Sequence, residues 1–161
     1  MKQFFSILMG IIALTLVSAC GGKATPEQLI VGTWVTAAPV EETENGMTMK
    51  FDDMQTSFNK DKTTASSGKI SMSGAMLPQA MEMTIDTTGT WSIDGMVISQ
   101  TITDADVKMT TNIPGMPDLG PVIAQGMIAE GATTSTILSI DKKSLLVKID
   151  STGTEMEMKK K

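Results

Sequence analysis

The segment Met81-Glu82-Met83-Thr84-Ile85 alternates apolar and polar side chains, and Thr90-Trp91-Ser92-Ile93 resumes that alternation shortly afterwards. Successive side chains of a strand point to opposite faces, so both segments predict half-buried β-strands. Asp94-Gly95 follows directly, and this dipeptide favours the tight turn of a β-hairpin. The apolar segment 96–103 then supplies the returning strand. These residues predict an antiparallel hairpin in the middle of the chain.

Further strand patterns recur along the chain, separated by turn residues. They cover residues 29–36, 47–51, 54–58, 69–73, 106–111, 134–140, 144–149 and 154–159. The residues between them predict a turn at Asp52-Asp53, a polar loop over 59–68 and a solvated loop at the acidic run Glu41-Glu42-Thr43-Glu44. So many strands leave awkward edges in an open sheet. The fold class predicted is therefore all-β, a single antiparallel up-and-down barrel of about eight to ten strands.

Two short helices are expected to accompany the strands. Thr25 followed by Pro26 is typical of a helix start, with Thr25 as the N-cap and Pro26 at the first helical position. Residues 112–121 contain Pro114, Pro117 and Pro121, which favour a loop. The apolar spacing in residues 122–129 then predicts a short helix after that Pro-rich loop.

The N-terminal segment has the pattern of an export signal. Lys2 precedes the apolar run 4–17, which is shorter than the roughly 20 residues that a spanning helix needs. Val17-Ser18-Ala19-Cys20 follows and resembles the lipobox of a bacterial lipoprotein signal. The resemblance implies cleavage before Cys20, a diacylglyceryl thioether on its sulfur and acylation of the new amine. The alternative is an ordinary secreted protein with a spare cysteine.

This pattern divides the chain into three parts. Residues 1–19 are expected to be the signal peptide, 20–26 the lipidated Cys20 with its tether, and 27–161 the barrel domain. Gly21, rather than Asp, follows the cysteine. That order resembles an outer-membrane sorting signal, which implies anchoring at the periplasmic face of the outer membrane. A lipid anchor of several acyl chains holds a protein durably, so the membrane is one expected partner.

The expected first helical turn leads directly into Gly32-Thr33-Trp34. This arrangement resembles the Gly-x-Trp signature that opens lipocalin-like barrels, the calycin-type small β-barrels. The resemblance implies that Trp34 packs across the bottom of the barrel. The final strands, residues 137–140 and 145–147, are similar to the closing strands of small bacterial lipocalin-like lipoproteins.

The composition excludes several classes of chemistry. The chain has no His, Arg or Tyr, and its only cysteine is Cys20. Catalysis by histidine, His/Cys zinc sites, thiol redox chemistry and bidentate arginine clamps are therefore excluded. The formal net charge of −5 argues against nucleic-acid binding. We expect no catalytic residues, no cofactor and no enzymatic activity, while the oligomeric state stays open.

Methionine is the unusual feature of the sequence, with 15 residues. Several occur as Met-x-Met pairs, namely Met47 with Met49, Met81 with Met83 and Met156 with Met158. The two members of a pair share one face of a strand, and the intervening polar residue faces the other way. Methionine packs irregular cores, lines adaptable apolar cavities and binds soft Cu(I) or Ag(I). All three interpretations stay open.

These observations predict a non-enzymatic, membrane-anchored envelope lipoprotein that binds or carries a small apolar ligand. The alternatives are a structural lipoprotein with a filled barrel and a protein that binds Cu(I) or Ag(I) through methionine. A ligand barrel should hold a cavity of a few hundred Å³, and a filled one should not. The residues expected to line such a cavity are Trp34, Met47, Met49, Met81, Met83 and Trp91.

Lipidation at Cys20 has a direct test. We expect metabolic labelling with a fatty-acid analogue to mark the protein, and Cys20→Ala to lose the label, since no other thiol exists in the chain. Label retained by Cys20→Ala would contradict the assignment.

Overall fold

The computed structural model describes residues 24–44, 46–75, 77, 79–111 and 117–161. The expected signal segment, Cys20 and the part of the expected tether up to residue 23 lie outside the described residues, as do residues 112–116 of the Pro-rich segment. The described elements are α1 (Pro26–Ile30), β1 (Gly32–Thr36), β2 (Val40–Glu44), β3 (Met47–Phe58), β4 (Thr63–Gly74), β5 (Met81–Asp94), β6 (Val97–Met109), α2 (Gly120–Ala129), β7 (Ala132–Ile140), β8 (Ser144–Ile149) and β9 (Glu155–Lys160).

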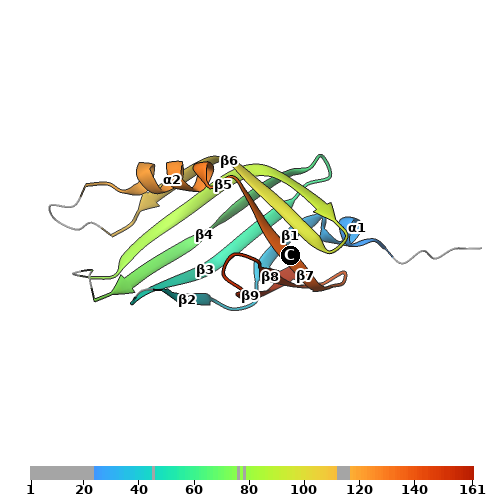
Figure 1. Ribbon diagram of the computed structural model, residues 1–161, viewed down its shortest axis with the longest axis horizontal. Helices are drawn as coiled ribbons and strands as arrows, with labels where there is room; N and C mark the ends of the chain where they lie inside the picture. The colour runs from blue at the N-terminus through green and yellow to red at the C-terminus, as the bar shows by residue number, and fades with distance from the viewer. Residues whose placement is uncertain (1–23, 45, 76, 78, 112–116) are drawn as a thin grey trace, which may run out of the picture.

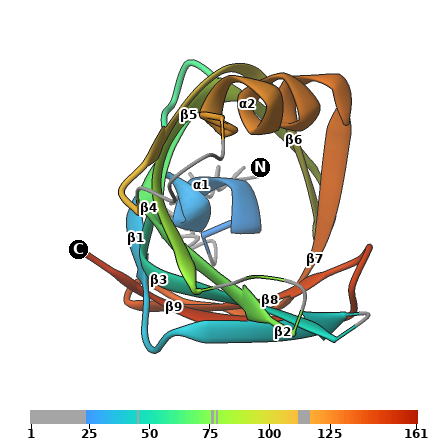
Figure 2. The ribbon, with the colours of Figure 1, turned by 90° about the vertical axis from the view of Figure 1, so that its left-hand side faces the viewer.

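Eight of the described strands form a closed ring. Each strand from β3 to β9 pairs antiparallel with its neighbour in sequence, and β1 pairs with both β9 and β3. β2 lies outside the ring. It pairs with residues 47–51 of β3, on the same edge where β1 pairs with residues 55–58. Figures 1 and 2 show the barrel from its side and from one end. The predicted all-β, up-and-down antiparallel barrel is confirmed, together with its two short helices.

The strands differ in length, and this gives the barrel two unlike ends. β3 to β6 have 12 to 14 residues, whereas the remaining strands have 5 to 9. The end that carries α1, the β3–β4 turn and the β7–β8 turn is called the closed end here. The long strands extend beyond the short ones at the opposite, open end, where α2 packs on β6 (Figure 1). Neither of these helices is long and apolar enough to cross a bilayer.

Trp34 fills the closed end, as the Gly-x-Trp resemblance implies. Its side chain is 0% exposed, and its indole Nε1 donates a hydrogen bond of 2.6 Å to the carbonyl oxygen of Ile30 in α1. Lys160 of β9 covers the other side, with its Nζ 5.0 Å from the indole ring. The same ammonium donates to the carbonyl oxygen of Leu29 at 2.9 Å. The helix end is thereby joined to the first and last strands.

Two apolar clusters stabilise the barrel. The cluster at the closed end contains Trp34 and an edge-to-face pair of Phe58 and Trp91, whose ring centroids lie 5.5 Å apart. The second cluster lies at the open end, where Ala124 of α2 packs against Met83 and Ile85 of β5. Because buried residues alternate along β5, both clusters lie on its inner face. α2 therefore packs inside the extended part of the barrel (Figure 2).

The expected turn at Asp52-Asp53 is wrong, because β3 runs through it as one strand. A register shift between Asp52 and Gln55 marks a β-bulge, and Asp53 adopts a φ of +52° there. Aspartate tolerates that left-handed conformation better than most residues do. The acidic charges that suggested a turn therefore lie on a bent strand.

Two expected loops are also wrong. β4 begins at Thr63, within the polar stretch predicted as a loop over 59–68. Its backbone pairs with both β3 and β5, so main-chain hydrogen bonds hold it in place without an apolar side-chain pattern. The acidic segment Val40–Glu44 forms β2 on the edge of β3. Charged side chains are typical of such exposed edges.

Two glycines give a paired test of this packing. A methyl group on Gly89 would lie 2.0 Å from the carbonyl oxygen of Thr101, so Gly89→Ala should lower the unfolding free energy by about 1–3 kcal/mol. A methyl on Gly126 of α2 meets nothing within 4 Å, and Gly126→Ala should raise the unfolding free energy by about 0.5–1 kcal/mol. Urea unfolding measures both changes. A neutral Gly89→Ala would contradict the close approach of β5 and β6.

Candidate functional site

A cavity of about 440 Å³ lies within the barrel, between β3 and the strands from β6 to β9. Its floor is apolar and belongs to the closed-end cluster. The floor is made by Phe58, Ile98, Leu145, Val147 and Met158, all of them buried. This surface offers dispersion contacts and no side-chain hydrogen bond.

The middle of the cavity is lined by larger, partly exposed apolar side chains. Met49, Phe51 and Met54 come from β3, while Ile149 follows along β8 and Met156 belongs to β9. Methionine side chains repack at low energetic cost, so this part of the wall suits apolar bodies of varied shape.

The remaining lining residues are polar. They include two carboxylates, Glu42 of β2 and Glu130 after α2, together with hydroxyls of residues 133–135. Thr152 donates a hydrogen bond of 3.0 Å to Glu42 Oε1, which connects the β8–β9 turn to β2. None of the lining residues is a lysine. The cavity therefore combines an apolar interior with an acidic rim.

The β8–β9 turn beside this rim is fixed by a second carboxylate. Hydrogen bonds from the Thr134 and Thr136 side chains lower the pKa of Asp150 below its ordinary value. The Thr136 bond measures 2.9 Å. The lowered pKa keeps Asp150 ionised further into the acidic range than an ordinary aspartate, so its hydrogen bonds to β7 persist there.

The predicted lining residues do not gather in one place. Only Met49 is among the residues that line the cavity. Trp34 and Trp91 are buried in the closed-end cluster, and Met83 is buried beneath α2. Met81 is buried at the open end of β5, paired with Met72 of β4, and Met47 is half-buried opposite Gly74. A role for these six residues in binding stays a prediction.

The β3 bulge explains why several lining residues were missed. Phe51 and Phe58 are seven positions apart, which places them on opposite faces of a regular strand. The register shift between them brings both side chains to the cavity. The alternating residues Leu145, Val147 and Ile149 were a readable pattern that pointed to the same wall.

The polar groups that line the cavity are of three kinds. The polar lining consists of hydroxyls, one amide and two carboxylates, in a chain without histidine. One of the carboxylates, Glu42, accepts a hydrogen bond from the Thr152 hydroxyl. Among the described residues, no group of three or more Asp, Glu, His or Cys side chains is placed to hold a metal ion. Thioether sulfurs do line the cavity, from Met49, Met54, Met156 and Met158.

Comparisons with known proteins give only a distant structural likeness. No family model matches the chain, and no curated protein matches it. Among solved structures, it is similar to a lipocalin-like protein from Bacteroides uniformis, at 16% identity and a TM-score of 0.46. That match covers 82% of this chain and 98% of the other. It is too distant to carry a function to this protein.

Two methionines distinguish core from cavity lining. Met83 is 2% exposed beneath α2, so Met83→Ala should cost about 2–5 kcal/mol of unfolding free energy. Met49 is partly exposed at the cavity wall, and Met49→Ala should cost less than about 1 kcal/mol. Chemical denaturation of both variants measures the difference. Equal costs would show that the Met49 side chain is packed as tightly as the core.

Proposed function

We propose that this protein is a membrane-anchored envelope lipoprotein that binds a small apolar ligand in its barrel and catalyses no reaction. The observation that carries the proposal is the cavity of about 440 Å³ with an apolar floor. Small-molecule pockets are concave and mainly apolar, with a few polar groups, and commonly measure about 300–1,000 Å³. The barrel cavity has these properties.

The size of the cavity favours a ligand over a filled barrel. Close-packed protein interiors contain few voids larger than a water molecule. A barrel that served only as a rigid scaffold would bring the side chains of β3 and β8 into contact across its centre. Here Phe51 and Ile149 instead line an open volume.

The polarity of the lining defines the ligand class. An apolar body would contact the floor, and any polar end would lie near Glu42 and Glu130. With no lysine among the lining residues, a carboxylate or phosphate would meet like charge and no counter-ion there. The proposed ligand is therefore an apolar molecule whose polar end, where present, is neutral or cationic.

The lipid anchor is part of the same proposal. An acylated Cys20 would hold the protein at the periplasmic face of the outer membrane, and the barrel begins a few residues later. A carrier of apolar molecules benefits from this position, because its cargo partitions into the adjacent bilayer. The anchor and the cavity are supported by separate observations, so an experiment can contradict one of them without contradicting the other.

Binding of Cu(I) or Ag(I) is the second candidate. Four methionines line the cavity, and thioethers select soft monovalent metals. The same lining lacks histidine and cysteine, which weakens this candidate against an apolar ligand. Titration with Cu(I) under reducing conditions separates the two, since stoichiometric uptake with loss of apolar-probe binding would favour the metal.

A neutral apolar fluorophore, N-phenyl-1-naphthylamine, tests the proposal. We expect saturable binding with one site per chain. Ile149→Trp places a larger ring at the cavity wall and should weaken binding at least about tenfold, equivalent to about 1.4 kcal/mol. Lys148→Trp changes the neighbouring, exposed residue of β8 and should leave binding unchanged.

Fluorescence titration reads both variants against the unaltered chain. Absence of saturable binding in the unaltered chain would contradict the ligand proposal and favour the structural alternative. Equal weakening by both substitutions would place the probe outside the cavity.

A further inference from the structure

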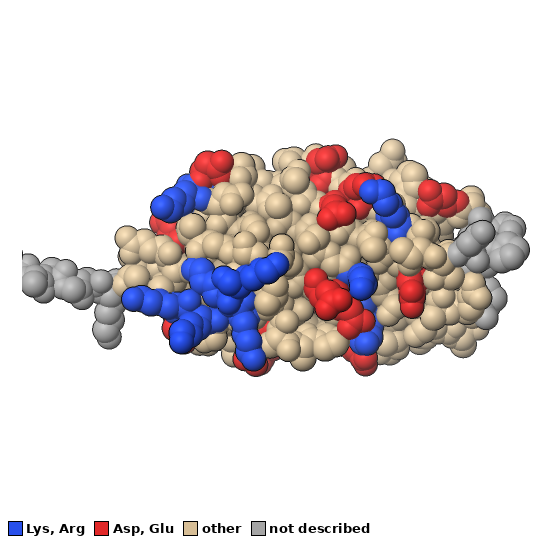
Figure 3. All heavy atoms as spheres, turned by 180° about the vertical axis from the view of Figure 1, so that it is seen from behind, with Lys and Arg blue, Asp and Glu red and all other residues tan. Residues whose placement is uncertain are grey.

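Lysines gather at the closed end of the barrel. They are residues 159–161 at the end of β9, residues 142–143 in the β7–β8 turn, and Lys60 and Lys62 in the β3–β4 turn. Figure 3 shows lysine side chains concentrated at one end of the molecule, while acidic side chains are spread over the remainder of that face. The chain contains 13 lysines in total, so about half of its positive charge lies at this end.

The carboxylates at the closed end are few, and three of them are already engaged. Glu27 pairs with Lys62. Asp61 accepts hydrogen bonds from the Thr63 side chain and backbone, and these lower its pKa. Asp141 accepts from the backbone of Lys143 and of Ser144, which lowers its pKa as well. With Asp94 they are four, against 18 acidic residues in the whole chain. The closed end is therefore positive on an acidic protein.

Some of these lysines hold the structure together, and others are available to a partner. Lys160 is committed to Leu29 and the Trp34 ring, and Lys62 lies 4.0 Å from the centroid of the Trp91 ring. The remaining exposed lysines have no side-chain hydrogen bond or ion pair within the described part of the chain, apart from Lys161, which contacts Gln55. They are Lys60, Lys142, Lys143 and Lys159, called the free lysines below.

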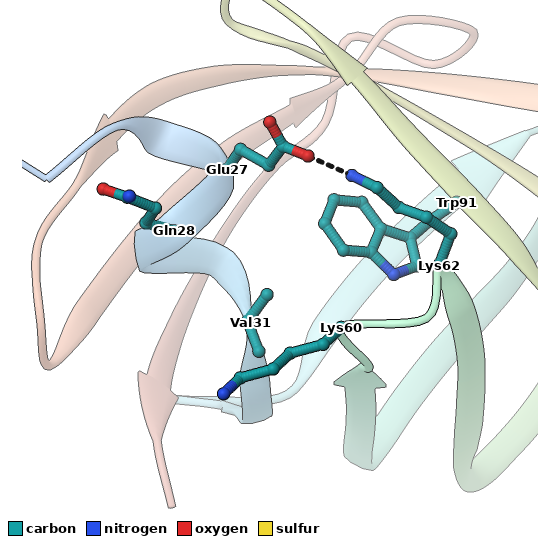
Figure 4. A pocket seen from close by; sticks show the side chains of 6 residues that line it. All are labelled: Glu27, Gln28, Val31, Lys60, Lys62 and Trp91. Atoms are coloured by element: carbon teal, nitrogen blue, oxygen red, sulfur yellow. Dashed lines mark hydrogen bonds and ion pairs between the residues drawn. The ribbon is translucent and has the colours of Figure 1, made fainter.

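A hollow beside α1 adds an apolar component to this surface. Its walls are Glu27, Gln28 and Val31 on one side, with Lys60, Lys62 and Trp91 on the other (Figure 4). The Lys60 ammonium thus lies at the edge of a recess that also presents an aliphatic side chain and an indole. Phospholipid headgroups combine a phosphate with adjoining apolar chains, and this recess offers a counterpart to both.

The entry point of the chain lies at the same end. The first described residues, 24 and 25, lead into α1, which caps the closed end. Cys20 and the apolar run 4–17 precede them by only a short stretch of sequence. Any attachment through those residues holds the closed end, rather than the open end, near the membrane surface.

From these observations we infer that the closed end docks onto an anionic phospholipid surface through the free lysines. This inference rests on the anchor in the proposed function, which supplies the local concentration. Basic residues near a bilayer are attracted by its negative surface potential. The acidic remainder of the barrel is repelled by that potential, so the cavity and its acidic rim face the aqueous side.

Lysine footprinting on vesicles tests this orientation. The full-length purified protein is reconstituted with phosphatidylglycerol–phosphatidylcholine vesicles or with phosphatidylcholine alone, floated, and labelled with an amine-reactive reagent. On the anionic vesicles we expect several-fold slower labelling of the free lysines. Lys69, Lys108 and Lys148, which are exposed away from the closed end, should label equally on both. High salt should remove the protection, because it screens exposed charges.

A variant pair makes the test specific. Lys142→Gln/Lys143→Gln/Lys159→Gln should return Lys60 to its labelling rate on neutral vesicles. Lys69→Gln/Lys108→Gln/Lys148→Gln removes the same amount of charge elsewhere and should leave Lys60 protected. Loss of Lys60 protection in both variants would show that net charge, rather than this surface, directs the protein.

The flotation outcomes separate docking from anchoring. Flotation with both vesicle types but equal labelling on both contradicts docking and leaves the anchor standing. Flotation with anionic vesicles alone supports docking and contradicts the anchor. If the protein floats with neither vesicle type, the result contradicts both the docking and the anchor. Protection of the free lysines by added RNA in place of anionic lipid would assign them to a nucleic acid and overturn the inference.

Discussion

The indole of Trp34 lies where β1 meets its two partners, and the closed ring depends on its packing. Trp34 pairs with Thr56 of β3 on one side and with Lys160 of β9 on the other. Its hydrogen bond to Ile30 and the Lys160 contact hold α1 across the barrel bottom. A buried indole N–H without a hydrogen-bond partner costs free energy. The Trp34 side chain in β1 therefore requires the Ile30 carbonyl at the end of α1 to lie where it does.

The second constraint is the bulge in β3. It turns Met49 and Phe51 before the shift, and Met54 and Phe58 after it, toward the barrel interior. The same long strand thereby contributes to the cavity, to the closed-end cluster and to the cluster beneath α2. Because β7 to β9 are shorter, α2 covers the inner face that those strands leave open. One strand irregularity and one difference in strand length therefore shape the interior.

The architecture was readable from sequence, whereas the cavity wall was not. Alternation in residues 81–94, the Thr25-Pro26 helix start and the Trp34 position are local patterns, and each predicts its element directly. The wall depends on the bulge at Asp53, which has a left-handed backbone conformation. The bulge shifts the later side chains of β3 to the opposite face from the one that strict alternation predicts. Met81 and Met83 show why alternation alone does not identify cavity residues. Alternation places them on the inner face, but only the long-range packing of α2 decides whether that face meets solvent, helix or cavity.

Native mass spectrometry of the full-length protein, purified gently from its own host, tests the central claim most directly. We expect a single adduct of small-molecule mass that is released on denaturation. We also expect Ile149→Trp to reduce the adduct greatly and Lys148→Trp to keep it, because Ile149 lines the cavity and Lys148 does not. A chain that carries no adduct and takes up no apolar molecule when one is supplied would contradict the claim that this barrel is a ligand carrier.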